Sequence, residues 1–440
     1  MSRANANTKP QFTSYGKMLQ TIAQIAADDW VGANETPVPA PDLRGLYDDA
    51  SFLRQARGYL RRLGDPNLAL VKVGDDPASD WTVGFEVRAA QDCLYVTDAW
   101  GDERLCTGDR IVAIDGRPLD AYRAEPDLRA ALWGEVPERE DWSYYLQYAT
   151  ELSVEFPAEN TRAALRPLHL PPSTPRSQEP ACSYSLFGRS NPAGHACYLR
   201  LGELEDAGEL EQLLAAHRDE LVSAERLVLD LRTCAGMPLD AAVALMPYLI
   251  DEPVTAAGFI GEQGLWVRYS QGNAGRMVAS LEAELAYTCD NDPDEQAFYE
   301  QEIARVRELA GAGLVWEDVA MPQEWLEPVV PAGGPARVVV LSDVGCRNES
   351  EQLLAMASAQ RKVTTLGRAS LGNSDYQQLM GVNFDDDVFF AYPAGMTRAA
   401  AEGQGVLGRG VQVDVRVPWD PAELERDVVL ERALGLGGVA

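Results

Sequence analysis

Two short apolar runs in the second half of the chain place the strongest limit on its fold. Residues 226–231 (RLVLDL) and 337–341 (RVVVL) are each followed by a turn and a segment with helical spacing. Valine and leucine runs of this length are typical of strands buried on both faces, and their alternation with helices predicts a largely parallel sheet. We therefore expect an α/β core with a mostly parallel sheet over residues 158–440. An insertion of helical character interrupts this core at about residues 253–333.

The part of the chain before this core has a different pattern. Residues 1–40 are polar and then proline-rich, with helical spacing at 15–28, and we interpret them as an N-terminal extension and a linker. Residues 41–78 contain a second helical pattern. Residues 79–157 contain short alternating strands with Gly-Asp and Asp-Gly turns, which predict a small β-rich domain.

The net negative charge of the chain restricts the kinds of molecule that it can bind. The 440 residues carry 68 acidic side chains against 38 lysines and arginines, for a net charge of −30. Nucleic acids and anionic membrane surfaces would repel such a chain, so we exclude both as partners. Basic peptides are compatible with this charge, although a role in solubility explains it more simply.

The cysteines and the acidic runs give no sign of a metal or a cofactor. Seven cysteines are scattered along the chain, and no close pair has the spacing of a zinc site or a disulfide framework. The acidic runs at residues 289–295 and 383–387 lack a full calcium-loop signature, so we interpret them as solvated turns. The first residues lack the apolar run of a signal peptide, and no stretch approaches the roughly 20 apolar residues of a membrane span. We therefore expect a cytoplasmic protein with no membrane insertion, cofactor or metal.

Four segments carry motifs whose order is informative. Residues 107–119 (TGDRIVAIDGRPL) look like the C-terminal half of a PDZ domain, and residues 227–251 like a strand, an Asp-Leu-Arg turn and a helix. Residues 338–378 look like a nucleophile loop, a helix and a base loop, and residues 408–418 like a closing strand. In this order the segments resemble the carboxyl-terminal processing, or tail-specific, serine peptidases. The resemblance implies a crotonase-like core and a PDZ-like domain, which would hold a peptide C-terminus on backbone N–H groups.

Two independent anchors locate the positions that should hold the catalytic residues of this family. The family's nucleophilic serine lies three residues before the glutamate that opens the helix, and matching that glutamate to Glu351 puts the nucleophile position at Asn348. The family's lysine follows a glycine, and matching that glycine to Gly372 puts the lysine position at Asn373. The separation, 373 − 348 = 25, is the one that the family uses. Gln377 stands where the family has a glutamine that orients the lysine.

Asparagine at both positions removes the chemistry of the family. Acyl transfer requires a hydroxyl or thiolate that a neighbouring base activates. Asparagine offers neither an oxygen nucleophile of this kind nor a titrating group. We expect Asn348 and Asn373 to hydrogen-bond to each other and to Gln377 in a neutral polar network. The leading hypothesis is therefore a pseudopeptidase, with hydrolysis lost, that binds peptide or protein C-termini.

The turn that should supply the oxyanion hole also departs from the family pattern. Met237 stands where a glycine is usual, and Pro238 removes a backbone donor. We therefore expect the hole to be eroded. The residues of this turn are Thr233, Cys234, Ala235, Gly236 and Met237.

Two other functions stay open at this point. Cys346 or Ser350 could serve as a relocated nucleophile in an active cysteine- or serine-type peptidase, although a cysteine would need a nearby histidine or another cause of a lowered pKa. The three histidines lie outside the site loops, and Asn67 stands where some relatives have a histidine. Alternatively, the chain could be a structural subunit that pairs with an active homologue. A homo-oligomer also stays open.

Overall fold

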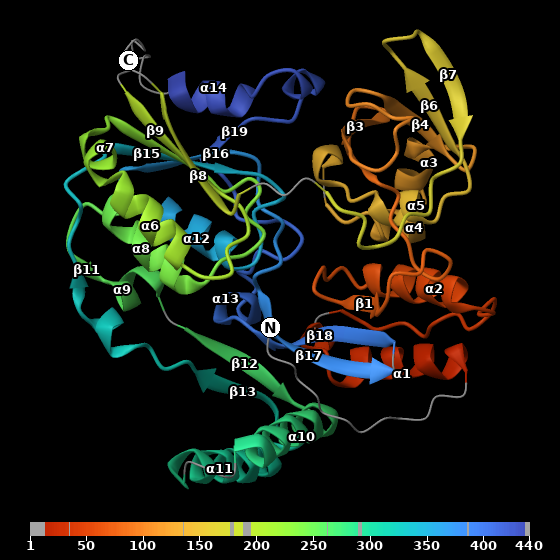
Figure 1. The fold of residues 1–440 in the computed structure, drawn as a ribbon. Helices are drawn as coiled ribbons and strands as arrows, with labels where there is room; N and C mark the ends of the chain where they lie inside the picture. The colour runs from red at the N-terminus through yellow and green to blue at the C-terminus, as the bar shows by residue number, and fades with distance from the viewer. Residues whose placement is uncertain are drawn as a thin grey trace.

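The computed structural model describes residues 14–435, except for residues 35, 135, 177–179, 188–194, 262, 289–292 and 385–386. A central α/β unit, a β-rich unit and an N-terminal helical unit lie side by side (Figure 1). Both acidic runs that we interpret as solvated turns fall partly outside the described residues. The mixed α/β class that the sequence predicts is confirmed.

The central sheet is built on the two apolar runs. Every residue of β10 is buried, and so are five of the six residues of β15, because helices cover both faces of this sheet. The strands β9, β10, β15, β16 and β19 pair in parallel, and only the edge strand β8 is antiparallel. In spatial order the strands are β19 (Val415–Arg416), β16 (Val363–Gly367), β15 (Arg337–Ser342), β10 (Arg226–Asp230), β9 (Ala196–Leu201) and β8 (Cys182–Phe187).

Helices on the two faces of this sheet bury different sets of side chains. On one face, Leu210, Leu245 and Leu353 belong to a large apolar cluster with the strand residues. On the other face, Val429 packs against Val228 and its neighbours. The helices of the first face are α6 (Gly208–Ala216), α7 (Arg218–Ser223), α8 (Leu239–Leu249), α9 (Ala256–Ile260) and α12 (Glu349–Ser358), and that of the second is α14 (Val428–Gly435).

The expectation of a mostly parallel sheet is correct only for this central sheet. The other sheets are antiparallel, so the strands of the whole chain are largely antiparallel. The reason is that hairpins and meanders, which need no helical crossover, make up the rest of the chain.

The β-rich unit forms where the sequence predicts it. The Gly-Asp and Asp-Gly turns are real turns, with φ of 97° at Gly108, 49° at Asp115 and 72° at Gly116. A separate apolar cluster that includes Leu94, Ile111 and Trp142 lies inside the unit. Its elements are β2 (Phe85–Ala90), β3 (Cys93–Ala99), β4 (Arg110–Ile114), β5 (Arg117–Pro118), α3 (Leu119–Ala124), α4 (Pro126–Ala130), α5 (Ser143–Gln147), β6 (Leu152–Phe156) and β7 (Thr161–Leu165).

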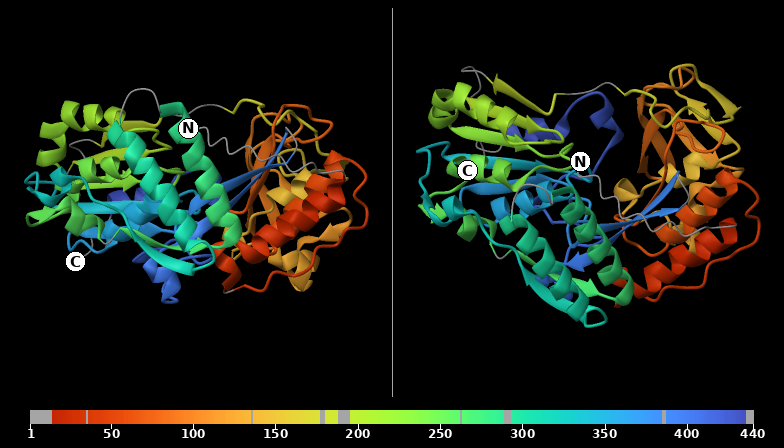
Figure 2. Two further views of the ribbon diagram at one scale, coloured as in Figure 1. Left: turned by 90° about the horizontal axis from the view of Figure 1, so that it is seen from below. Right: turned by 60° about the horizontal axis from the view of Figure 1, so that its bottom comes forward.

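The first helix has the predicted bounds, α1 (Tyr15–Asp28), but it is part of a packed unit and not an appendage. Its Leu19 and Ile22 are fully buried in a cluster with α2 (Asp49–Arg61) and with the hairpin of β17 (Tyr376–Phe384) and β18 (Val388–Met396). This hairpin follows the base loop in sequence, and it reaches from the central unit to the N-terminal helices (Figure 2). The N-terminal segment therefore helps to position the candidate site.

The insertion has more strand structure than its sequence suggests. Besides the helices α10 (Gln271–Thr288) and α11 (Pro293–Leu309), it contributes β12 (Gly264–Tyr269) and β13 (Gly313–Asp318). Strand β12 pairs with β18, which ties the insertion to the hairpin beside the base loop. Within the described residues, no helix is long and apolar enough to cross a membrane.

Candidate active site

The position at which the sequence predicts the nucleophile lies on a strained turn between a buried strand and a helix. Asn348 is the residue before α12, and its backbone has φ 57° and ψ −131°. L-residues with a side chain rarely adopt this conformation, which costs about 1–3 kcal/mol and persists only where the surroundings enforce it. Sharp strand-to-helix turns present the nucleophile in α/β-hydrolases. Asn348 stands between a buried strand and a helix in a strained conformation, with an amide as its side chain.

Three asparagines form a continuous hydrogen-bonded chain at the site. The Asn373 side-chain amide donates to Asn348 Oδ1 at 2.6 Å and to Asn67 Oδ1 at 3.0 Å, and Asn348 N donates to Asn373 Oδ1 at 2.9 Å. The Asn67 amide donates in turn to the carbonyls of Asn373 and Tyr376, both at 2.8 Å. The predicted contact between Asn348 and Asn373 is therefore confirmed. The position noted for a histidine in some relatives also holds an asparagine that reaches the same network.

The prediction that Gln377 joins the asparagine network is wrong. Its side-chain amide donates to the carbonyl of Ser374 at 2.8 Å. Among the hydrogen bonds of the described residues, none links Gln377 to Asn348 or Asn373. The glutamine instead forms a local hydrogen bond within the segment that follows Asn373.

The two anchors that locate the asparagines in the sequence are in direct contact. The carboxylate of Glu351 is fully buried and accepts hydrogen bonds from the backbone N–H groups of Gly372 at 2.5 Å, Asn373 at 3.1 Å and Ser374 at 3.0 Å. It also accepts from the hydroxyl of Ser370 and, at 2.6 Å, from that of Ser374. Glu351 thus fastens the base loop to the helix that begins at the nucleophile position.

Two more buried carboxyls lie close to this network. Asp65 accepts hydrogen bonds from Trp30 Nε1 and from the backbone N–H of Asn67, both at 2.8 Å. Burial, with a smaller contribution from the nearby Asp375, raises the pKa of Asp65 to about 6. Asp375 accepts from the N–H groups of Val406 and Leu407, and burial raises its pKa above the usual range.

Substitution of Asp65 by asparagine is expected to change how stability depends on pH. Because the folded-state pKa is above the unfolded value of about 3.9, ionisation of Asp65 removes stability as the pH rises from about 4 to about 6. Asparagine cannot ionise, so the stability of Asp65→Asn relative to wild type should increase by roughly 2–3 kcal/mol across this window. Urea unfolding of both proteins between pH 4 and 7.5 measures this difference. A difference that is constant with pH would contradict this assignment.

The expected oxyanion turn keeps free donors. The carbonyl of Ala235 accepts from the Asn348 amide at 2.6 Å, and that of Gly236 accepts from the N–H of Leu204 at 3.0 Å. Among the hydrogen bonds of the described residues, the N–H groups of Ala235 and Gly236 donate none. Met237 is buried in the core cluster, so it does not fill the site.

The two candidate substitute nucleophiles are not accessible. Cys346 and Ser350 are fully buried, and burial raises the pKa of the Cys346 thiol far above its usual range. The Ser350 hydroxyl lies 2.6 Å from the carbonyl oxygen of Cys234 and accepts from the N–H of Arg347 at 3.0 Å. Both side chains are therefore part of the buried packing beneath the turn at Asn348, and neither is activated as a nucleophile.

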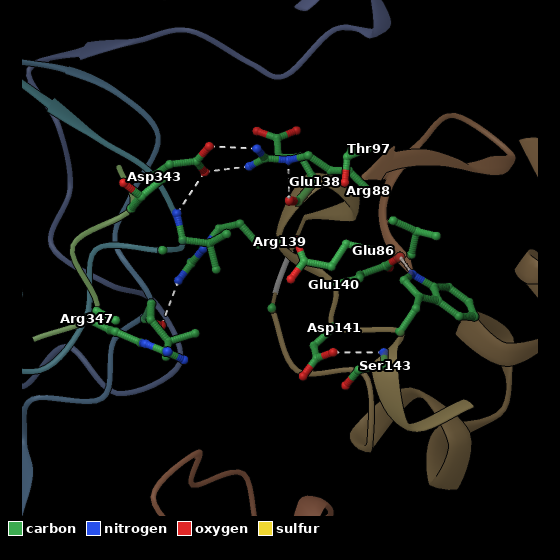
Figure 3. Close-up of a pocket in the computed structure, with 18 of the residues that line it drawn as sticks. Glu86, Arg88, Thr97, Glu138, Arg139, Glu140, Asp141, Ser143, Asp343 and Arg347 are labelled. Atoms are coloured by element: carbon green, nitrogen blue, oxygen red, sulfur yellow. Dashed lines mark hydrogen bonds and ion pairs between the residues drawn. The ribbon is translucent and has the colours of Figure 1, made fainter. Parts of the chain in front are cut away.

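A cleft of about 1210 Å³ lies between the β-rich unit and the central unit, beside the asparagine chain. Arg347 and Leu371, the neighbours of Asn348 and Gly372, line it, and the three asparagines are not among its described lining residues. Strand β2 and residues 138–143 form the opposite wall (Figure 3).

Ion pairs and hydrogen bonds join the two walls of this cleft. The Arg88 guanidinium binds both carboxylate oxygens of Asp343, one at 2.6 Å, and the Arg368 guanidinium binds the same carboxylate at 2.7 Å (Figure 3). Burial disfavours ionisation of Asp343, but the two guanidiniums outweigh it and hold its pKa well below the usual range. Arg139 donates across the cleft to the carbonyls of Ser370 at 2.6 Å and Leu371 at 3.0 Å.

Comparison with known proteins adds a likeness of fold. No protein-family profile and no curated protein sequence matches the chain. The solved structure of mature CPAF complexed with lactacystin matches over 96% of this chain and 97% of that chain, at 12% identity and a TM-score of 0.62. A second structure of mature CPAF matches over 97% and 98%, at 11% identity and a TM-score of 0.59. The photosystem II D1 C-terminal processing protease matches more weakly, at 15% identity and a TM-score of 0.45 over 97% and 98%.

This chain therefore has the fold of mature CPAF over nearly the full length of both proteins. The resemblance to carboxyl-terminal processing peptidases that the sequence motifs carry is borne out as a likeness of fold.

Proposed function

We propose that this chain is a non-hydrolysing relative of the carboxyl-terminal processing peptidases that binds peptide or protein C-termini. The observation that carries the proposal is the asparagine chain Asn348–Asn373–Asn67, which occupies an otherwise preserved site. The strained turn, the buried Glu351 anchor and the free donors of the oxyanion turn support a retained scaffold.

The chemistry of the asparagine chain supports the loss of hydrolysis. Peptide cleavage needs a nucleophile and a group that takes its proton and later returns it to the leaving amine. A side-chain amide donates and accepts hydrogen bonds but does not titrate between pH 5 and 8. A network of such amides can hold a carbonyl or an N–H group of a bound peptide without attacking it.

The same proposal covers the domain organisation. The central unit would be a crotonase-like core over residues 158–440, with an insertion at about 253–333, and residues 79–157 would be a PDZ-like domain. Residues 1–40 and 41–78 would form the N-terminal extension and helical segment. A cytoplasmic location stays a prediction from the sequence.

The rival function, an active peptidase with a relocated nucleophile, loses support from the burial of Cys346 and Ser350. The histidines do not restore it, because His169 stacks on Trp81 and His217 on Tyr184, and His195 directly precedes β9. A role as a structural partner subunit of an active homologue stays an untested alternative.

We expect the purified protein to leave peptide bonds intact. Denatured casein and a fluorescein-labelled pool of peptides with free C-termini would be incubated with it at a range of pH values, and products followed by mass spectrometry. The expected result is cleavage no faster than with Asn348→Ala, because the side chains at the predicted nucleophile and lysine positions are amides, which neither attack a carbonyl nor titrate. Robust cleavage that disappears in Cys346→Ala or Ser350→Ala would overturn the proposal and favour the relocated nucleophile.

A further inference from the structure

The carboxylates that line the cleft are all neutralised within the chain. Each of them forms an ion pair with an arginine, so the cleft offers no free acidic group from its described lining to a ligand. The pairs are Asp80–Arg57, Glu86–Arg176, Glu138–Arg416, Glu140–Arg123, Asp141–Arg61, Asp230–Arg232, Asp343–Arg88 and Glu423–Arg368.

Arg347 differs from these arginines because its charge is not compensated. It lines the cleft and is exposed, and its guanidinium forms no hydrogen bond or ion pair with any described residue. In a chain with 68 acidic side chains and only 38 lysines and arginines, a cleft cation without an acidic partner is unexpected. An anionic group of a ligand would supply the missing partner.

The position of Arg347 is fixed although its side chain is free. Its backbone N–H donates to Ser350 Oγ at 3.0 Å and lies 3.3 Å from the carbonyl oxygen of Cys234. It directly precedes the strained Asn348, and Ala235, which has an uncommitted N–H, lines the same wall. A planar guanidinium with a backbone donor nearby suits the two oxygens of a carboxylate. Figure 3 shows Arg347 on the central-unit wall, opposite β2.

We propose that Arg347 binds the terminal carboxylate of a peptide held in the cleft, at the place where an active relative would cut the chain. This inference rests on the proposed function, since it assumes that a peptide occupies the cleft. Strand β2 supports an extended ligand, because it is the edge strand of its sheet and Phe85, Glu86, Val87 and Arg88 line the cleft. A peptide can add to such an edge through its backbone. The terminal carboxylate then supplies the acidic partner that Arg347 lacks.

The test compares three fluorescein-labelled peptide pools that are random at the last six positions. One pool ends in a free carboxylate, one in an amide, and one in an amide with a glutamate fixed at the last position. Fluorescence anisotropy gives the apparent Kd of each pool for wild type, Arg347→Ala and Arg347→Lys. Arg361→Ala is the matched control, because Arg361 is largely exposed and does not line the cleft.

We expect wild type to bind the free-carboxylate pool about tenfold or more tightly than either amidated pool, as a charge-assisted hydrogen-bonded pair predicts. Arg347→Ala should bind all three pools alike, Arg347→Lys should keep part of the preference, and Arg361→Ala should keep all of it. All variants should share the urea midpoint of wild type.

Two results would overturn the assignment while leaving peptide binding intact. In one, wild type binds the carboxylate and amide pools equally; in the other, Arg347→Ala retains the preference. Preference for the glutamate pool over the free-carboxylate pool would assign Arg347 to an acidic side chain instead and would also overturn it. Binding of no pool at all would contradict the proposed function itself.

Discussion

Replacement of Glu351 by alanine is expected to lower the free energy of unfolding by roughly 3–5 kcal/mol. The carboxylate is fully buried, and it accepts from the N–H groups of Gly372, Asn373 and Ser374 as well as from two hydroxyls. Its removal leaves these donors buried without an acceptor, and each unsatisfied group costs about 1–3 kcal/mol. Urea unfolding at pH 7.5, followed by tryptophan fluorescence, measures the change.

The chain supplies a matched control for this substitution. Glu349 lies in the same first turn of α12 but is exposed, so Glu349→Ala should change stability by no more than about 1 kcal/mol. Glu351→Gln should fall between the two, because the amide keeps the volume and one oxygen acceptor but turns a donor toward the loop N–H groups. A loss below about 1 kcal/mol in Glu351→Ala would mean that the carboxylate does not hold the base loop.

The positions of the two asparagines were predictable because local geometry fixes them. The sequence spacing from Glu351 and Gly372 reflects a strand, a turn and a helix, and each of these is determined by neighbouring residues. The structure adds the reason for the agreement between the anchors, which is the hydrogen bond between Gly372 N and the Glu351 carboxylate. The buried strands and the two turns of the β-rich unit were predictable on the same local grounds.

Contacts between distant parts of the chain could not be predicted from the sequence patterns. Asn67 reaches Asn373 across 306 positions, and Arg88 reaches Asp343 across 255 positions. A single polar residue carries no periodicity, so nothing in the sequence pairs such side chains. The predicted hydrogen bond between Gln377 and the asparagines is wrong for a related reason, because a side-chain amide turns to whichever acceptor the folded loop presents.

Side-chain amides stand at the two positions where the resemblance to the peptidases places the catalytic pair. The contacts around these positions are nevertheless formed: the strained backbone at Asn348, the Glu351 anchor and the Asp343 pair. Strained backbone and buried charge both cost stability unless the surroundings compensate for them. The proposed ligand-binding function would account for their presence.

Substitution of Asp343 by asparagine is expected to cost about 3 kcal/mol of unfolding free energy at pH 7.5. The carboxylate is buried between the guanidiniums of Arg88 and Arg368, and asparagine would leave Arg88 without a counter-charge and turn an amide donor toward one of them. Asp92→Asn is the matched control, because the same charge is removed from an exposed turn, and it should change stability by less than about 0.5 kcal/mol.

The pH dependence separates the charge of Asp343 from its shape. Because the folded-state pKa lies below the unfolded value of about 3.9, the ion pairs contribute their full stability above pH 4 and lose it as the pH falls further. The gap between wild type and Asp343→Asn should therefore be constant from pH 5 to 8 and should narrow below pH 4. A gap that persists unchanged at pH 3 would assign the effect to packing, and a gap below about 1 kcal/mol at pH 7.5 would mean that the two walls of the cleft are held together by other contacts.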